Sequence, residues 1–220
     1  MNNRKAVNPK RAYDSSRRKQ KARETRARIV DAASRLFLGH GYGATSVETI
    51  AAAAGVAAET VYLQFGTKAR LLAALLDVAL VGDDEPVPLL DRPWMRSVLN
   101  EAEPRARLRA LASNTRRILE ALGPVHAIMR AAALAEPQIA ELARVHAERR
   151  LEGQANLVDW IAQGAALRPG LNRTRAGEAY FALTSPELHH LFTEELRWSG
   201  RRYENWLYET LLAQLLALER

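Results

Sequence analysis

The segment of residues 45–68, TSVETIAAAAGVAAETVYLQFGTK, constrains the fold of this chain more than any other stretch. Its apolar spacing predicts a helix over residues 45–54 and a shorter helix over residues 58–65. Gly55 stands between them, where glycine adopts a positive φ without steric cost. Two short helices joined by a tight glycine-containing turn are typical of a helix-turn-helix, whose second helix is free to enter a DNA major groove.

The starts of the two helices differ in their capping residues. Thr45 and Glu48 stand at the spacing of a capping box, in which the hydroxyl accepts from the Glu48 amide and the carboxylate reaches back. Ala57 precedes the second helix and has no side chain that can cap it, which forfeits ~1 kcal/mol relative to Ser or Thr. Glu59 in the first turn partly offsets this loss through the helix dipole.

Further helices are predicted on both sides of this segment. Upstream, apolar residues recur at helical spacing from about Arg23 to Gly39-His40-Gly41, which ends the helix. This stripe consists of Ile29, Val30, Ala33, Leu36, Phe37 and His40. Downstream, Thr67 is expected to cap a helix that continues to Gly82. The sequence therefore predicts an N-terminal domain over residues 23–81 that contains a three-helix DNA-binding head.

The remainder of the chain is also predicted to be helical. Alanine, leucine and arginine dominate and β-branched residues are sparse, which favours an all-α fold. The acidic, proline-broken stretch 82–88 is predicted to be a domain boundary. Beyond it, helices are expected at about 93–101, 104–121, 124–135, 137–164, 173–195 (with a possible break at Ser185-Pro186) and 199–218. Pro104, Pro124 and Pro137 stand at first-turn positions, where a missing N–H costs nothing. We predict about nine or ten helices, no strands, and a second helical domain over residues 93–220.

Positive charge is concentrated at the N-terminus. Residues 1–28 carry a net charge of +9 against +7 for the whole chain, which leaves −2 for everything after residue 28. Because residues 1–20 are charged and poor in apolar side chains, we expect residues 1–22 to be a basic arm that is disordered without a polyanion. Beside a helix-turn-helix, such an arm is an electrostatic anchor for phosphates. The alternative is a solubilising tail.

Composition argues against several other classes of protein. The chain has no cysteine, which excludes disulfides and thiolate metal sites and suits a reducing cytoplasm. No apolar run reaches the ~18 residues of a membrane span, and the basic start lacks the apolar core of a signal peptide. We therefore expect a cytoplasmic protein with no membrane partner.

Catalytic and metal-binding motifs are not apparent in the sequence. It has no phosphate-binding loop and no serine in a nucleophile-elbow setting. His189 and His190 are adjacent, so on a helix they point about 100° apart and cannot both chelate one ion unaided. We expect no enzyme activity, no metal and no cofactor.

The run Thr60-Val61-Tyr62-Leu63-Gln64-Phe65, followed by Gly66-Thr67-Lys68 and Leu71-Leu72, resembles the TetR family of bacterial repressors. The resemblance extends from about Thr25 to Leu76 and implies that Tyr62 and Lys68 contact backbone phosphates. We expect the DNA-binding residues to be Thr45, Ser46, Ala58, Glu59, Thr60, Tyr62, Leu63, Gln64 and Lys68. On residue type alone, Tyr62 is equally a half-buried packing residue and Lys68 an incidental surface lysine.

One expected base-facing residue departs from the family pattern. Gln64 occupies a position that relatives often fill with histidine. Glutamine can pair with adenine through N6 and N7 in the major groove, so the operator sequence cannot be inherited from relatives.

The second domain is rich in aromatic and methionine residues, which suit either a core or an apolar pocket. The segment from Trp94 to Arg220 is similar to the C-terminal domain of many actinobacterial TetR-like regulators, which implies a ligand-binding role. Our candidates for ligand contacts are Trp94, Met129, Trp160, Phe181 and His189. The last helix is apolar on more than one side and must be covered accordingly. The resemblance implies a homodimer through the last two long helices; the alternative is packing within one subunit.

The sequence as a whole therefore indicates a DNA-binding transcriptional regulator. We expect a repressor that a small apolar or amphipathic ligand releases from a palindromic operator on double-stranded DNA. A DNA-binding protein without sequence preference, driven by the basic arm, is the first alternative. A helical ligand-binding module or enzyme with a basic tail is the second, but it requires a catalytic constellation in residues 93–220, and none can be assembled there.

Overall fold

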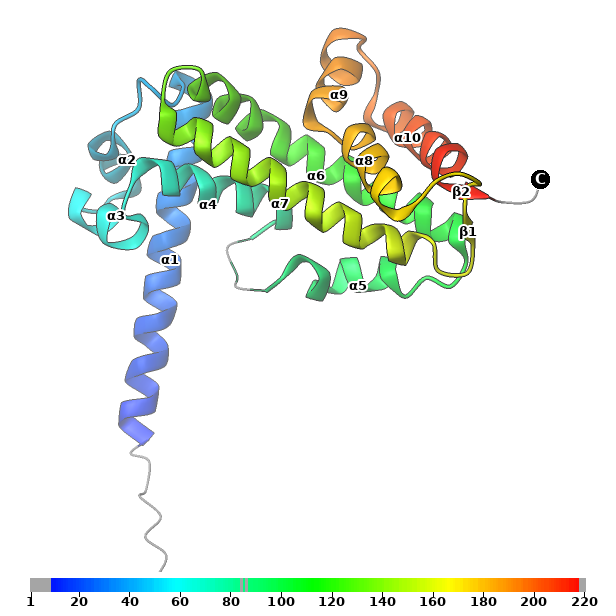
Figure 1. The fold of residues 1–220 in the computed structure, drawn as a ribbon. Coiled ribbons are helices and arrows are strands. Elements are labelled where there is room, and N and C mark those ends of the chain that lie inside the picture. The colour runs from blue at the N-terminus through cyan, green and yellow to red at the C-terminus, as the bar shows by residue number, and fades with distance from the viewer. Residues whose placement is uncertain (1–8, 84, 86, 218–220) are drawn as a thin grey trace, which may run out of the picture. The chain divides into compact units, whose positions relative to one another are not determined.

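The fold is taken from a computed structural model, which describes residues 9–83, 85 and 87–217 (Figure 1). The chain divides into two compact units, the first ending at Leu75 and the second beginning at Leu76. This division lies within helix α4 (Lys68–Val81), upstream of the acidic stretch 82–88 where we predicted a boundary. The described residues contain helices α1 to α10 and a single pair of two-residue strands, so the predicted all-α class with about nine or ten helices is confirmed.

The first unit is built on helices that the apolar periodicity had placed. They are α1 (Pro9–His40), α2 (Val47–Ala54), α3 (Ala58–Phe65) and the first part of α4. Their inward side chains are buried, among them Ile29, Phe37, Ile50, Val61 and Leu71. The predicted limits of α3 and the left-handed turn at Gly55, with a φ of 65°, are confirmed.

Helix α1 begins much earlier than the sequence suggested. We expected disorder through residue 22, whereas the structure begins the helix at Pro9; residues 1–8 lie outside the described part. No glycine or proline interrupts residues 10–38, and arginine, lysine, glutamine and alanine are strong helix formers. Gln20 also donates to Glu24 one turn later, at 3.2 Å. High helix propensity therefore outweighs the low apolar content that predicted disorder.

The predicted cap of α2 is wrong by one residue. The N-cap is Ser46, whose Oγ accepts from the Thr49 amide at 3.1 Å. Thr45 is instead 2% exposed and donates its hydroxyl to Gly41 O at 2.8 Å, with Leu36 O at 3.3 Å. The carbonyls at the end of α1 and in the turn after it need donors, and Thr45 supplies one.

The second unit packs its helices around one hydrophobic core. Its elements are α5 (Pro93–Leu99), α6 (Pro104–Ala133), α7 (Pro137–Ile161), α8 (Arg173–Leu183), α9 (Pro186–His190) and α10 (Gly200–Leu215), with a 3₁₀ turn at Leu89–Asp91 and a π-helical turn at Leu191–Glu195. Helix α7 packs between α6 and α8, and α10 packs on α6 and α8 (Figure 1). The shared core includes Leu108, Leu111, Ile161, Tyr203 and Leu211.

Two features of this unit differ from the prediction. Helix α6 runs without a break through Pro124, so the predicted separate helices 104–121 and 124–135 are wrong. Leu122 and Val125 on either side of the exposed proline are both buried in the same apolar face, which holds the helix together despite the lost N–H. The strands β1 (Ala166–Leu167) and β2 (Leu216–Ala217) pair antiparallel; two residues are too short to produce an alternating pattern.

The remaining helix breaks follow their local signals. Pro104 and Pro137 occupy first-turn positions, as predicted. Helix α8 ends at Leu183, and Ser185 caps α9 by accepting from the Leu188 amide at 3.1 Å, which confirms the break at Ser185-Pro186. The chain therefore turns sharply between α8 and α9.

Close packing of α7 on α8 leads to the first testable prediction. A β-carbon at Gly177 would lie 3.0 Å from Ala155 Cα, whereas one at Gly153 would meet nothing within 4 Å. Gly177→Ala should therefore lower the free energy of unfolding by about 1 kcal/mol, because overpacking exceeds the gain in helix propensity. Gly153→Ala, the matched control in α7, should raise it by about 0.5–1 kcal/mol. Denaturant unfolding measures both; stabilisation by G177A would contradict the packing described.

Candidate nucleic-acid interface and ligand pocket

The outer face of α3 is unusually exposed for its residue types. Leu63 is 88% exposed and Tyr62 is 48% exposed, while Val61 and Phe65 on the opposite face are buried. Of the other expected contacts, Glu59 is exposed, and Ala58, Thr60 and Gln64 are half-buried. Two adjacent large side chains, Tyr62 and Leu63, are thus exposed on a short helix whose opposite face is packed, which makes this face a candidate surface for a partner.

Lys68 ties the start of α4 to the loop between α1 and α2. Its Nζ donates to Tyr42 O at 3.0 Å and to Thr45 O at 3.2 Å, and it lies 4.0 Å from the centre of the Tyr42 ring. These carbonyls explain why a cation is tolerated near a helix N-terminus, a position that favours anions. Thr67 caps the helix as predicted, accepting from the Arg70 amide at 3.1 Å. An ammonium has three N–H donors, so one remains available to an anion.

The expected DNA contact of Thr45 is contradicted by the structure. The side chain is buried, and its single hydroxyl proton is donated to the backbone of Gly41. Ser46 beside it is exposed, with its hydroxyl bonded to Thr49 at the start of α2. Thr45 therefore shapes the turn below the surface.

Basic side chains from neighbouring helices flank α3. The Arg26 guanidinium carbon lies 4.3 Å from the centre of the Phe65 ring. Arg28 Nη1 lies 3.7 Å from where a β-carbon of Gly55 would stand, and Arg70 Nη1 lies 3.5 Å from the same point at Gly66. Positive charge thus lies near both ends of a helix that has no basic residue of its own. The sequence alone could not predict that these three arginines lie beside α3, because their positions depend on how α1 and α4 pack.

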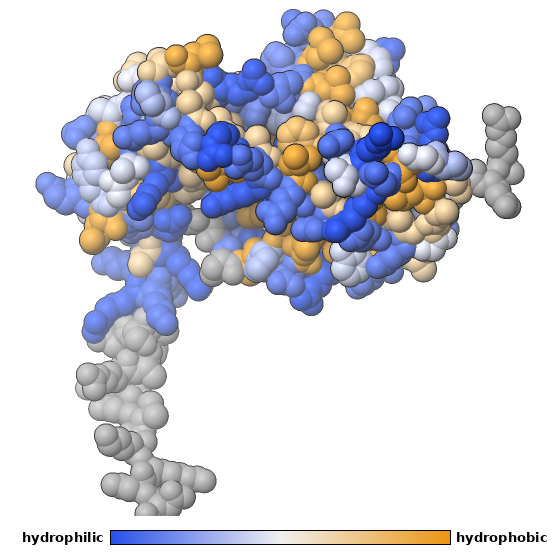
Figure 2. All heavy atoms as spheres, viewed as in Figure 1, coloured by the Kyte–Doolittle hydropathy of each residue, from blue (hydrophilic) through white to orange (hydrophobic). Residues whose placement is uncertain are grey.

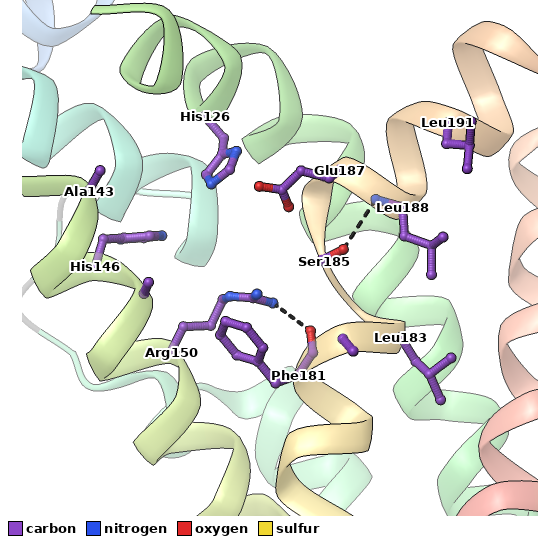
Figure 3. Close-up of a pocket in the computed structure, with 12 residues that line it drawn as sticks. His126, Ala143, His146, Arg150, Phe181, Leu183, Ser185, Glu187, Leu188 and Leu191 are labelled. Atoms are coloured by element: carbon purple, nitrogen blue, oxygen red, sulfur yellow. Dashed lines mark hydrogen bonds between the residues drawn. The ribbon is translucent and has the colours of Figure 1, made fainter. Parts of the chain in front are cut away.

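The second unit contains a cavity of about 640 Å³ lined by α6, α7, α8, α9 and the turn after α9 (Figure 3). Its apolar lining includes Ala143, Ala147, Phe181, Leu183, Leu188 and Leu191. Its polar lining is His126, His146, Arg150, Ser185 and Glu187. The size and the mostly apolar lining with a few convergent polar groups are typical of a small-molecule site.

Arg150 is the central charged group of this cavity. Its guanidinium stacks on the Phe181 ring, with Cζ 3.6 Å from the ring centre, and Nη1 donates to Phe181 O at 3.2 Å and to Thr184 O at 3.3 Å. Burial lowers the pKa of Arg150, and the nearby Glu187 carboxylate opposes that shift. The guanidinium remains charged, since arginine does not deprotonate in proteins.

Burial controls the charge of the two cavity histidines. The rings of His126 and His146 lie 6.3 Å apart. Burial lowers the pKa of His126 to about 4, with Glu187 opposing the shift and His146 adding to it. Burial and the charge of Arg150 lower the pKa of His146. Both imidazoles are therefore neutral near pH 7.

The negative charge of Glu187 is balanced by Arg130 at the rim of the cavity. Burial alone would raise the pKa of its carboxyl group, but hydrogen bonds from its own amide and from Arg130 lower it. The carboxylate forms an ion pair with Arg130, which is largely exposed.

The predicted ligand contacts fall in different places. Phe181 lines the cavity. Trp94 and Trp160 pack against the hydrophobic core, and Met129 is fully buried in α6. His189 is buried edge-on against Tyr203, with ring centres 4.8 Å apart. These four do not line the cavity.

Sequence reasoning missed the polar residues of the cavity, although a signal was present. Helix α7 turns Ala143, His146, Ala147 and Arg150 toward the cavity in its N-terminal half. Its C-terminal half instead turns Leu157, Val158 and Ile161 into the core. Small and polar residues of α7 therefore lie between the buried Ile139 near its start and the large apolar residues of its second half, and they mark where α7 leaves space.

Apolar side chains also reach the surface around α9 and the π-helical turn that follows it (Figure 2). Leu191 and Leu196 are 39% and 54% exposed. Beside them the Phe192 ring packs at a tilt against Trp198 and Trp206, with ring centres 4.4 and 4.3 Å apart.

Within residues 9–83, 85 and 87–217, no group of three or more metal-ligating side chains is placed to hold an ion. Over the same residues, no helix combines the length and apolar character needed to cross a membrane.

Sequence comparisons find known proteins that are similar to part of this chain. The family model described as "Bacterial regulatory proteins, tetR family" matches residues 29–75. The HTH-type transcriptional regulator TtgR of Pseudomonas putida is 38% identical over 117 residues, 48% of this chain and 52% of TtgR. AcrR of Shigella flexneri is 41% identical over 61 residues, 28% of each chain. This chain thus spans about half the length of TtgR and less of AcrR.

Solved structures resemble the chain over most of its length. NalD of Pseudomonas aeruginosa, the secondary repressor of the MexAB-OprM multidrug efflux pump, has a TM-score of 0.62 at 22% identity, covering 87% of this chain and 96% of NalD. SmeT in complex with triclosan has a TM-score of 0.64 at 22% identity, covering 88% of this chain and 92% of SmeT. At this level of identity, the likeness establishes the fold.

Replacing His126 by Gln should make the thermal unfolding temperature less sensitive to acid. Between pH 6.5 and about 4, the unfolded chain binds a proton at His126 that the folded chain does not bind. Wild type therefore loses stability as the pH falls through this window, and the effect vanishes above pH 6.5. Circular dichroism melts at about pH 7 and pH 5 measure the difference.

The exposed His190 provides the control, and H190Q should behave like wild type. An equal loss of melting temperature on acidification in H126Q and wild type would show that burial does not hold this imidazole neutral.

Proposed function

We propose that this chain, which belongs to the TetR family of bacterial regulatory proteins, is a homodimeric repressor that a small molecule releases from its DNA operator. The observation that carries the proposal is the exposed face of α3, with Tyr62 and Leu63 in water on a helix whose other face is buried. A helix-turn-helix presents its second helix to the major groove in this way. The protein acts on DNA in the bacterial cytoplasm.

The head divides its DNA contacts between phosphates and bases. Tyr62 and the remaining donor of Lys68 bind backbone phosphates and set the register. Thr60, Leu63 and Gln64 face the bases, with Gln64 suited to adenine. Ser46, Ala58 and Glu59 lie beside these positions and complete the contact surface.

Charge for non-specific attraction comes from outside α3. The positive potential that α3 lacks comes from the arginines that flank it, Arg26, Arg28 and Arg70, and from the exposed basic residues of α1, Arg17, Arg18, Lys19 and Lys21. They strengthen binding to any sequence, while α3 distinguishes one sequence from another.

The second unit binds the effector and forms the dimer. The cavity between α6 and α9 has the size of a small-molecule site, and SmeT, which shares the fold, was solved with triclosan. The half-buried Phe192, Trp198 and Trp206, with exposed Leu191 and Leu196, form an apolar face suited to a second copy. Two-fold symmetry then pairs two α3 helices on a palindromic site.

Recovery of bound fragments from the host genome by purified full-length protein tests this function. The expected result is enrichment of a palindrome with half-sites about one helical turn apart. Random recovery would defeat the proposal and favour the alternative, a binder without sequence preference that relies on the basic part of α1.

Two variants then test the division of labour on the recovered site. Tyr62→Phe should weaken binding to every sequence by roughly tenfold, because one hydrogen bond to a charged phosphate is lost. Gln64→Ala should relax the preference at one base pair of each half-site, removing about 1–3 kcal/mol of discrimination. Competition binding against all single-base variants measures both effects. A change of preferred base in Y62F would show that the tyrosine reads sequence.

A further inference from the structure

We infer that the cavity between α6 and α9 binds an amphipathic carboxylic acid, with the acid group on Arg150 and the apolar tail along Leu183, Leu188 and Leu191. The inference rests on the proposed function only in treating this cavity as the effector site. It adds the charge and shape of the ligand.

The unused donors of Arg150 point to an anion. Both of its hydrogen bonds to protein carbonyls use Nη1, so Nε and Nη2 have no hydrogen-bond partner among the described residues. The Phe181 ring, 3.6 Å from Cζ, and the two carbonyls hold the guanidinium in place. A carboxylate can accept from two guanidinium N–H groups in one plane, and this pairing is stronger than a neutral hydrogen bond.

The cavity has an excess of positive charge. Among the described residues that line it, the only carboxylate is that of Glu187, which is already paired with Arg130 at the rim. No carboxylate forms an ion pair with Arg150 within the described part of the chain. A cationic ligand would have to displace Arg130 and approach the unpaired Arg150, whereas an anion meets the charge that lacks a partner.

The imidazoles add hydrogen-bonding capacity at the same place. His126 descends from α6 and His146 projects from α7 toward the space in front of Arg150 (Figure 3). Burial holds the pKa of both below the ordinary range, so each neutral ring has one N–H to donate near pH 7. The neutral imidazoles of His126 and His146 can therefore donate to an acid group that is bound to Arg150, and they bring no further charge near its apolar tail.

The remaining walls suit an apolar tail. Ala143 and Ala147 leave space along α7, and Leu183, Leu188 and Leu191 close the other side. Because the alanines stand where the second half of α7 has large side chains, the tail occupies volume that the core does not fill.

Three probes with eight carbons each test the charge preference: octanoate, octanol and octylammonium. Binding to full-length protein is measured by calorimetry near pH 7. Octanoate should bind at least about tenfold more tightly than the other two, because only it pairs with Arg150. Tightest binding of octylammonium, or equal binding of all three, would overturn the inference.

Substitutions then test whether Arg150 is responsible for the tighter binding of octanoate. Arg150→Met should remove the preference for octanoate, and Arg150→Lys should retain part of it, since the charge survives without the planar fork. Arg144→Met is the matched control on the same helix; Arg144 pairs with Glu141 and Glu148 outside the cavity, so octanoate should bind that variant as it binds wild type. Octanoate affinity unchanged in both R150M and R150K would place the acid elsewhere and overturn the assignment.

DNA binding separates this inference from the proposed function. If octanoate binds through Arg150 but leaves operator affinity unchanged, the ligand assignment stands and the effector role of the cavity fails. If the protein selects a palindrome but shows no binding of octanoate, the regulator stands and the ligand assignment fails.

Discussion

The Lys68 ammonium is the interaction on which the DNA-facing head most depends. It donates to two carbonyls of the loop between α1 and α2 while standing at the first residue of α4, so it joins the segments on either side of the helix-turn-helix. Tyr42 and Thr45, which supply those carbonyls, are themselves buried. Helix α3 lies between these two attachments in the sequence and has only Val61 and Phe65 buried. The same cation that fixes this geometry has a third N–H, which under the proposed function binds a phosphate.

In the second unit the important feature is a space that side chains leave unfilled. Large apolar side chains fill the core around Leu108, Ile161 and Leu211. The N-terminal half of α7 has alanines where such residues would fit, and it has Arg150 and His146 among them. The cavity therefore exists because one helix face changes character part-way along its length. Arg150 is held there by its contact with the Phe181 ring and by the carbonyls of Phe181 and Thr184, and its Nε and Nη2 have no hydrogen-bond partner among the described residues.

Sequence signals from neighbouring residues predicted the helices and turns of the first unit well. The features that they missed depend on contacts between helices. The limits of α3, the Gly55 turn and the Thr67 cap follow from residues within a few positions of each other. The N-cap of α2 is Ser46 and not the predicted Thr45, because the Thr45 hydroxyl donates to the carbonyl of Gly41 just after the end of α1. Pro124 failed to end a helix because its neighbours are buried on both sides. The cavity, and the arginines around α3, depend on side chains brought together across helices, which periodicity in one helix cannot show.

Hydrogen exchange of Lys68→Met without DNA tests the role of this anchor most directly. Methionine keeps the apolar stem but removes both donations, each worth about 1.5–3 kcal/mol for a charged donor, so amides at Thr45 and in α2 should exchange at least about tenfold faster. Amides in α6 should be unchanged, as should the whole pattern in Arg70→Met, the control that removes an exposed charge from the same helix. Unchanged protection at Thr45 and α2 in K68M would show that the head holds its shape without this ammonium.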